Sequence, residues 1–204
     1  MSPLILVTGF APFGGERTNP SWDVAKGLDG MELSGATLRA IRLPVNCARA
    51  SRMIADAIEK TGPDAILGLG QAGGRPALSI EKVAVNLADG RASREIDGGV
   101  KGNPVVRGGP DAYFSRLPIP AILAALKKRG IPAGLSLSAG VYVCNAVMYS
   151  ALHAMRRRRS VPAGFIHLPY EAAQATGHRG AASMSHAMMT EGIAIALDVI
   201  ARKL

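Results

Sequence analysis

Apolar residues along the chain follow two different spacings. Short runs rich in apolar and β-branched residues, which favour strands, occupy residues 4–8, 37–43, 65–69, 79–87, 134–138 and 163–167. Between them lie stretches with the apolar spacing of amphipathic helices, at residues 47–60, 120–129, 144–158 and 183–203. Strands that alternate with helices predict an α/β fold. We expect one domain over residues 1–204, an α/β/α sandwich with a mostly parallel, twisted sheet covered by helices on both faces.

The region from residue 88 to residue 118 is the least regular part of the pattern. Seven glycines or prolines lie between Gly98 and Pro110 alone. We therefore predict a long loop here, of the kind that is usually functional.

Composition narrows the class of protein. The chain has 204 residues and is 48% apolar, which excludes a disordered chain. No apolar run approaches the roughly 20 residues of a membrane span, and the first residues lack the basic region and the small-residue cleavage site of a secretory signal. Two cysteines, Cys47 and Cys144, are too few for a disulfide framework or a cysteine zinc site. We expect a cytoplasmic protein with no membrane partner.

The net charge of +9 raises nucleic-acid binding as an alternative. The basic residues are spread along the chain, however, and the run Arg156–Arg159 falls where a helix is predicted to end. Cations at that place complement the helix dipole. A solvated helix end is the better interpretation, and we expect no nucleic-acid partner.

The residues that follow the predicted strands are where ligands bind in open α/β sheets. Phe10 and Phe13 lie in a glycine-rich loop after the first strand and account for two of only four phenylalanines. They either close the end of the core or form apolar walls for a small flat ligand. The sequence alone leaves both interpretations open.

The residues Gly68-Leu69-Gly70-Gln71-Ala72-Gly73 match the glycine fingerprint of dinucleotide-binding proteins. That fingerprint requires a helix to begin at these glycines, whereas here Gly74-Arg75-Pro76 leads into another predicted strand. A dinucleotide-binding oxidoreductase that uses Gly68–Gly73 remains the alternative function. In the next strand Glu81 adjoins Lys82, so one of these two charges must point to a place where charge is tolerated.

Cys144 and His167 are candidates for nucleophilic chemistry. Cys144 falls in the first turn of a predicted helix, where the dipole is expected to lower the pKa of a thiol. His167 ends a predicted strand. A thiol, an imidazole and a carboxylate that orients the imidazole make a nucleophilic triad, although a small buried thiol is the commoner fate of a cysteine. We interpret Cys47 as a packing residue.

Four stretches of the sequence form a recognisable series: GFAPFGG at 9–15 with NPSW at 19–22, GLGQAGGR at 68–75 with IEKVAVN at 80–86, SAG and YVCN within 138–145, and GFIHLP at 164–169. In these stretches and in their order, the chain resembles the pyroglutamyl-peptidase I family of cysteine peptidases. The four stretches span almost the whole chain.

The resemblance implies a single catalytic domain that removes an N-terminal pyroglutamyl residue from peptides through a thioacyl intermediate. It implies a triad of Cys144, His167 and Glu81, no cofactor or metal, a cytoplasmic location and a homotetramer. For the substrate pocket it implies five residues: Phe10, Phe13, Gln71, Val143 and Arg91. The segment 92–102 departs from the family pattern, and Ala92 removes an apolar residue that the family usually supplies to the pocket.

Overall fold

The computed structural model describes residues 2–88 and 102–204. The predicted loop from residue 88 onward therefore lies partly outside the described residues. The described strands are β1 (Leu4–Phe10), β2 (Glu32–Leu33), β3 (Ala36–Leu43), β4 (Ala65–Gln71), β5 (Leu78–Glu81), β6 (Val83–Val85), β7 (Ala112–Phe114), β8 (Ala133–Ser136), β9 (Ala163–Leu168), β10 (Tyr170–Glu171) and β11 (Ser183–Met184). The helices are α1 (Pro20–Gly27), α2 (Cys47–Thr61), α3 (Ile119–Lys128), α4 (Val143–Ala154), α5 (Ala172–Ala175) and α6 (His186–Ala201).

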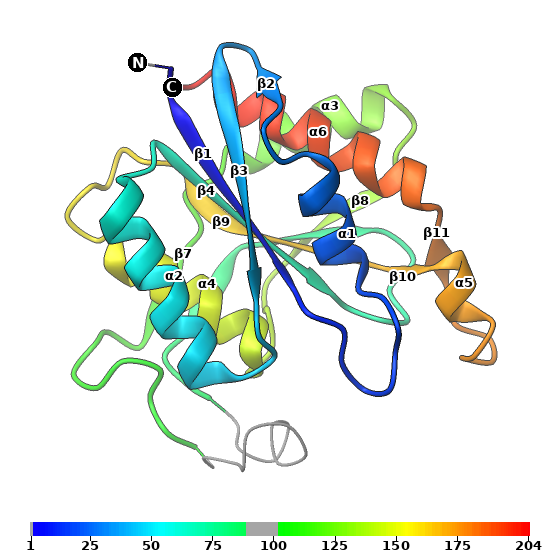
Figure 1. The fold of residues 1–204 in the computed structure, drawn as a ribbon, viewed down its shortest axis with the longest axis horizontal. Helices are drawn as coiled ribbons and strands as arrows, with labels where there is room; N and C mark the ends of the chain where they lie inside the picture. The colour runs from blue at the N-terminus through cyan, green and yellow to red at the C-terminus, as the bar shows by residue number, and fades with distance from the viewer. Residues whose placement is uncertain (1, 89–101) are drawn as a thin grey trace.

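The central sheet has the strand order β2-β3-β1-β4-β9-β5-β8. Strands β3, β1, β4 and β9 run parallel to one another, and β5 is parallel to β8. By contrast, β2 is antiparallel to β3 and β5 is antiparallel to β9. Helices α2 and α4 cover one face, and α1, α3 and α6 cover the other (Figure 1). The predicted α/β/α sandwich with a mostly parallel sheet is confirmed.

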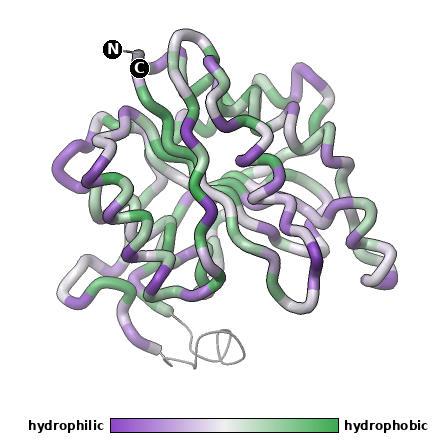
Figure 2. Tube along the Cα trace, in the orientation of Figure 1, coloured by the Kyte–Doolittle hydropathy of each residue, from purple (hydrophilic) through white to green (hydrophobic). Residues whose placement is uncertain are grey.

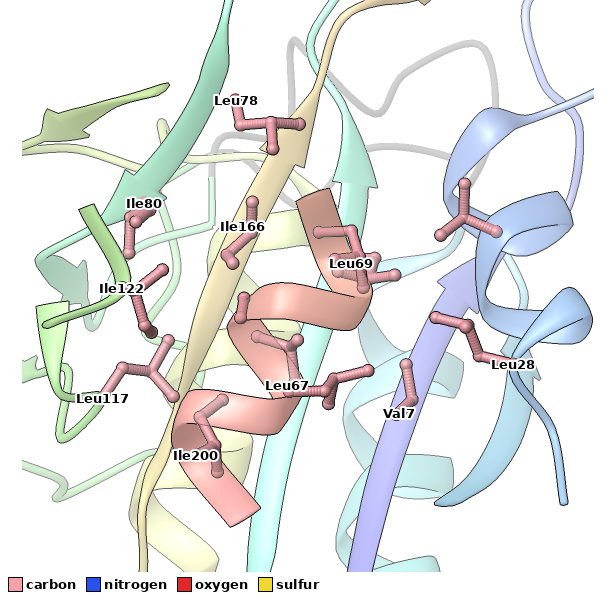
Figure 3. Packing of buried hydrophobic residues seen from close by; sticks show 14 of the residues in the cluster. Val7, Leu28, Leu67, Leu69, Leu78, Ile80, Leu117, Ile122, Ile166 and Ile200 are labelled. Carbon is pink, nitrogen blue, oxygen red and sulfur yellow. The ribbon is translucent and has the colours of Figure 1, made fainter. Parts of the chain in front are cut away.

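Alternate side chains of the central strands enter two separate cores. In β4, Leu67 and Leu69 pack toward α6, whereas Ile66 packs toward α2 and α4. Figure 3 shows the first core from close by, with side chains from neighbouring strands and from α6. Hydrophobic residues follow the strands through the middle of the molecule, and hydrophilic residues gather on the outer turns (Figure 2). This two-sided burial explains the continuous apolar runs in the sequence.

Two details differ from the sequence-based expectation. The strand predicted over residues 79–87 is two strands, because the chain leaves the central sheet at Lys82 and then pairs with β7 inside the predicted loop. The Lys82 ammonium lies over the ring of the exposed Phe114, 5.8 Å from its centroid, so this charge stays out of the sheet. The helix predicted over 144–158 ends at Ala154, and Arg156–Arg159 follow it in a turn.

No helix in the described part of the chain is long and apolar enough to cross a membrane.

Candidate active site

His167 and Glu81 form a buried hydrogen-bonded pair in the middle of the sheet. The Nδ1 atom of His167 lies 2.7 Å from Oε1 of Glu81, and the two residues are 4% and 0% exposed. The antiparallel register of β5 and β9 places Ser79 opposite His167, so Glu81 is its diagonal neighbour on the same face. An ionised carboxylate only accepts hydrogen bonds, so Nδ1 carries the proton and Nε2 is the basic nitrogen.

Arg75 binds the same carboxylate oxygen. Its Nη1 atom donates to Oε1 of Glu81 at 2.8 Å, while the side chain itself is 35% exposed. Arg75 follows the turn that joins β4 to β5. Gly74 in that turn has a φ of +84°, which residues with a side chain rarely adopt.

Cys144 is the second residue of α4, and its sulfur lies over the backbone of Gly70. A Cβ atom at Gly70 would be 2.8 Å from Sγ of Cys144 and 2.8 Å from Cζ of Phe165. Gly70 is the register partner of His167 in the parallel pair β4–β9. The thiol and the imidazole therefore lie on the same face of neighbouring strands. Among the residues that the structure describes, no hydrogen bond joins Cys144 and His167, which is common in unliganded enzymes.

Burial sets the protonation of these groups. It raises the pKa of Cys144 to about 12, and the charge of Glu81 adds to that effect. The expectation that the helix start lowers this pKa is wrong, because desolvation of the sulfur outweighs the dipole. Burial also lowers the pKa of His167, although Glu81 opposes that shift. The pKa of Glu81 is lowered: burial raises it, but the hydrogen bonds and charges of its partners prevail. These directions favour the neutral forms of the Cys144 thiol and the His167 imidazole.

A small cavity of about 30 Å³ adjoins the thiol. Its walls are Phe10, Phe13, Asn19, Val45, Gln71, Tyr142, Val143 and Cys144. Four of the five residues predicted for substrate binding are therefore together next to the candidate nucleophile. The fifth, Arg91, lies outside the described residues, as does Ala92. Two larger hollows of about 550 and 530 Å³ adjoin the run Arg156–Arg159 and contain none of the predicted site residues.

The model of the family described as pyroglutamyl peptidase matches residues 4–203. The chain belongs to this family. It is 44% identical to the pyrrolidone-carboxylate peptidase of Klebsiella pneumoniae (strain 342), over 98% of this chain and 93% of that protein. The crystal structure of pyroglutamyl peptidase I from Bacillus amyloliquefaciens matches with a TM-score of 0.92 and 37% identity, over 98% of this chain and 96% of that one. A mutant pyrrolidone carboxyl peptidase from P. furiosus matches with a TM-score of 0.93 and 40% identity, over 98% and 99% of the chains.

As a pyroglutamyl peptidase, the chain is a cysteine-type hydrolase that removes N-terminal pyroglutamate. The alternative of a dinucleotide-binding oxidoreductase is not supported. The glycines on which that alternative rested allow close packing instead. A Cβ at Gly68 would be 2.4 Å from the Phe165 ring, and one at Gly73 would be 2.0 Å from the Tyr170 ring. No helix begins at these glycines, because β5 follows the turn.

Sequence reasoning missed several residues of the candidate site. Asn19 stands in one of the quoted motifs without a role, and it both caps α1 and lines the cavity. Val45 gave no signal, because it is an ordinary apolar residue near a predicted helix start, and Tyr142 stands in a quoted motif without a role. Arg75 belonged to a quoted motif without a role. The sequence did offer one signal for Arg75: it is a cation that follows a glycine turn and precedes Glu81 by six residues.

Proposed function

We propose that Cys144 is the nucleophile, His167 the general base and acid, and Glu81 the orienting carboxylate in the removal of N-terminal pyroglutamate from peptides. The observation that carries this proposal is the buried His167–Glu81 hydrogen bond of 2.7 Å on the face where the Cys144 sulfur lies. Glu81 fixes the imidazole tautomer with Nε2 as the basic nitrogen and stabilises the imidazolium that forms during the reaction.

The high pKa of the thiol assigns the first proton transfer to His167. The Cys144 thiol gives its proton to Nε2 of His167 as the sulfur attacks the pyroglutamyl carbonyl carbon. The imidazolium then protonates the departing amine of the peptide, which leaves a thioester on Cys144. A water molecule that loses a proton to His167 hydrolyses the thioester and releases pyroglutamate. The backbone N–H of Cys144, in the first turn of α4, is suited to stabilise the oxyanion.

The cavity matches the chemistry of the pyrrolidone ring. Phe10, Phe13 and Val143 supply apolar surface, and Gln71 at the end of β4 supplies polar groups for the lactam. Its volume of about 30 Å³ holds only about two water molecules, so the cavity must widen when the ring binds. Proline lacks the ring carbonyl and would leave a buried polar group unpaired, so the site is expected to reject it. Arg91 is proposed as a further substrate-binding residue on the family resemblance alone.

The family resemblance also supports the finer features of the proposal. We propose that residues 1–204 act as a single catalytic domain, that the enzyme needs no cofactor, and that it works in the cytoplasm as a homotetramer. Its partners are peptides that begin with pyroglutamate.

The test is hydrolysis of a chromogenic pyroglutamyl amide by the purified, reduced protein. We expect release of the chromogenic amine from this conjugate and little from the prolyl analogue. Cys144→Ser should abolish the activity, whereas Cys47→Ser should keep most of it. A wild-type protein that leaves the conjugate intact would refute the proposed activity, and equal loss in both variants would refute the choice of nucleophile.

A further inference from the structure

Glu81 Oε1 accepts two hydrogen bonds, one from His167 and one from Arg75. His167 Nδ1 lies at 2.7 Å and Arg75 Nη1 at 2.8 Å. The carboxylate is fully buried, so its charge has no access to solvent. A buried carboxylate needs a partner that is charged throughout the reaction, and the neutral imidazole of the resting state does not provide that charge.

The turn between β4 and β5 holds Arg75 in place. Its backbone N–H donates to the carbonyl of Ala72 at 3.3 Å, and Gly74 occupies the left-handed region with a φ of +84°. Gly73 packs so closely on the Tyr170 ring that a Cβ atom would lie 2.0 Å from it. Both glycines are therefore needed to bring the guanidinium to Glu81.

On the basis of the proposed triad, we propose that Arg75 is a positioning residue for catalysis: it holds the ionised Glu81 carboxylate by Oε1 and thereby fixes His167 in its reactive tautomer. Arg75 does not line the cavity next to Cys144, so its effect is on proton transfer and not on recognition of the pyrrolidone ring.

The charges around the two reacting groups support this role. Glu81 and Arg75 act on His167 in opposite directions: the carboxylate raises its pKa and the guanidinium lowers it. Glu81, Cys47 and Arg75 act on Cys144, and only the guanidinium among them lowers the pKa of the thiol. With Glu81 alone, the imidazolium would be a weak acid toward the departing amine and the thiol would be harder to deprotonate. Arg75 offsets both effects.

The test compares Arg75→Met with the wild-type enzyme. Loss of the guanidinium should raise the pKa of both Cys144 and His167, so the pH profile of kcat/KM should move to higher pH on both limbs. We expect kcat to fall about tenfold or more, in the range found for partners that orient a histidine, while KM stays near its wild-type value. An increase of about one unit in the thiol pKa makes alkylation of Cys144 by iodoacetamide about tenfold slower at pH 8. Site-resolved mass spectrometry separates this signal from Cys47.

Two further variants control for folding and for general charge effects. Arg75→Lys keeps a cationic donor for Glu81 and should restore most of kcat and of the profile. Lys82→Met removes a cation from the residue next to Glu81, where the ammonium faces Phe114. This change should leave the pH profile of kcat/KM and the alkylation rate of Cys144 unchanged. An Arg75→Met protein with the wild-type profile and alkylation rate would overturn the proposal, as would an equal shift in Lys82→Met. Alkylation of Cys144 can be measured without turnover. Failure of the wild-type protein to cleave the conjugate would therefore refute the proposed function and leave the test of Arg75 by alkylation intact.

Discussion

The substitution Gly70→Ala would test whether the position of the Cys144 sulfur limits catalysis. An added Cβ would lie 2.8 Å from Sγ of Cys144 and 2.8 and 2.9 Å from two ring carbons of Phe165. Phe165 is fully buried between β4 and α4, so its ring has little room to move. We therefore expect the thiol to be pushed away from the backbone of Gly70 on β4 and out of its position relative to His167.

The contact distances give the size of the effect. Ordinary contact with a Cβ atom begins near 3.4 Å, so Sγ must move by about 0.6 Å from its distance of 2.8 Å. A misplacement of about 1 Å in a reacting group costs about a hundredfold in rate, so about 0.6 Å corresponds to roughly tenfold. Overpacking against Phe165 should also lower the free energy of unfolding by about 1–3 kcal/mol.

Gly68→Ala is the matched control. Its Cβ would lie 2.4 Å from the same Phe165 ring but is not in contact with the thiol. Both variants should lose stability in urea unfolding, and only Gly70→Ala should lose kcat per folded molecule in the conjugate assay. Equal kcat in the two variants, at any level, would show that displacement of the sulfur is not the cause and would refute the reasoning.

Three further predictions concern His167, Asn145 and the turn before Arg75. His167 has a lowered pKa when folded, so the unfolded chain binds its proton first as pH falls below about 6.5, and stability declines with acid by up to about 1.4 kcal/mol per pH unit; urea titrations at pH 7.5 and 5.5 should show a smaller decline in His167→Gln. Asn145 is fully buried and makes three hydrogen bonds to the backbone of Val85 and Leu87, so Asn145→Ala should cost about 2–3 kcal/mol in urea unfolding. Gly73→Ala should displace the turn before Arg75 and lower kcat, with little further loss when combined with Arg75→Met.

Most of the sheet could be predicted because each parallel strand is buried on both faces. The runs at 4–8, 65–69 and 163–167 are continuous and apolar, and each corresponds to a central strand. The rule that chemistry lies at the ends of parallel strands found Phe10, Gln71 and His167, which sit at or near the ends of β1, β4 and β9. These residues could be located without knowing which strands pair with one another.

The electrostatics of Cys144 could not be predicted from its place in the sequence. A helix start is a local feature, and its effect on a thiol can be stated from the sequence. Desolvation depends on what packs around the sulfur, here the backbone of Gly70 and the ring of Phe165 from two other strands. Desolvation is the larger of the two effects, so the pKa of Cys144 is raised where the helix start alone predicted that it is lowered.

The location of Glu81 depends on a strand direction that no local pattern encodes. If β5 were parallel to β9, its last residue would lie at the carboxyl end of β9 near Leu168 and not opposite Phe165. Because β5 is antiparallel, Glu81 lies opposite Phe165, inside the sheet, and is fully buried. A screened acid would orient His167 only weakly, whereas a buried one acts strongly but requires a compensating charge. The reversal of β5 thus explains two features together: the strength of the Glu81–His167 pair and the presence of Arg75 on the same oxygen.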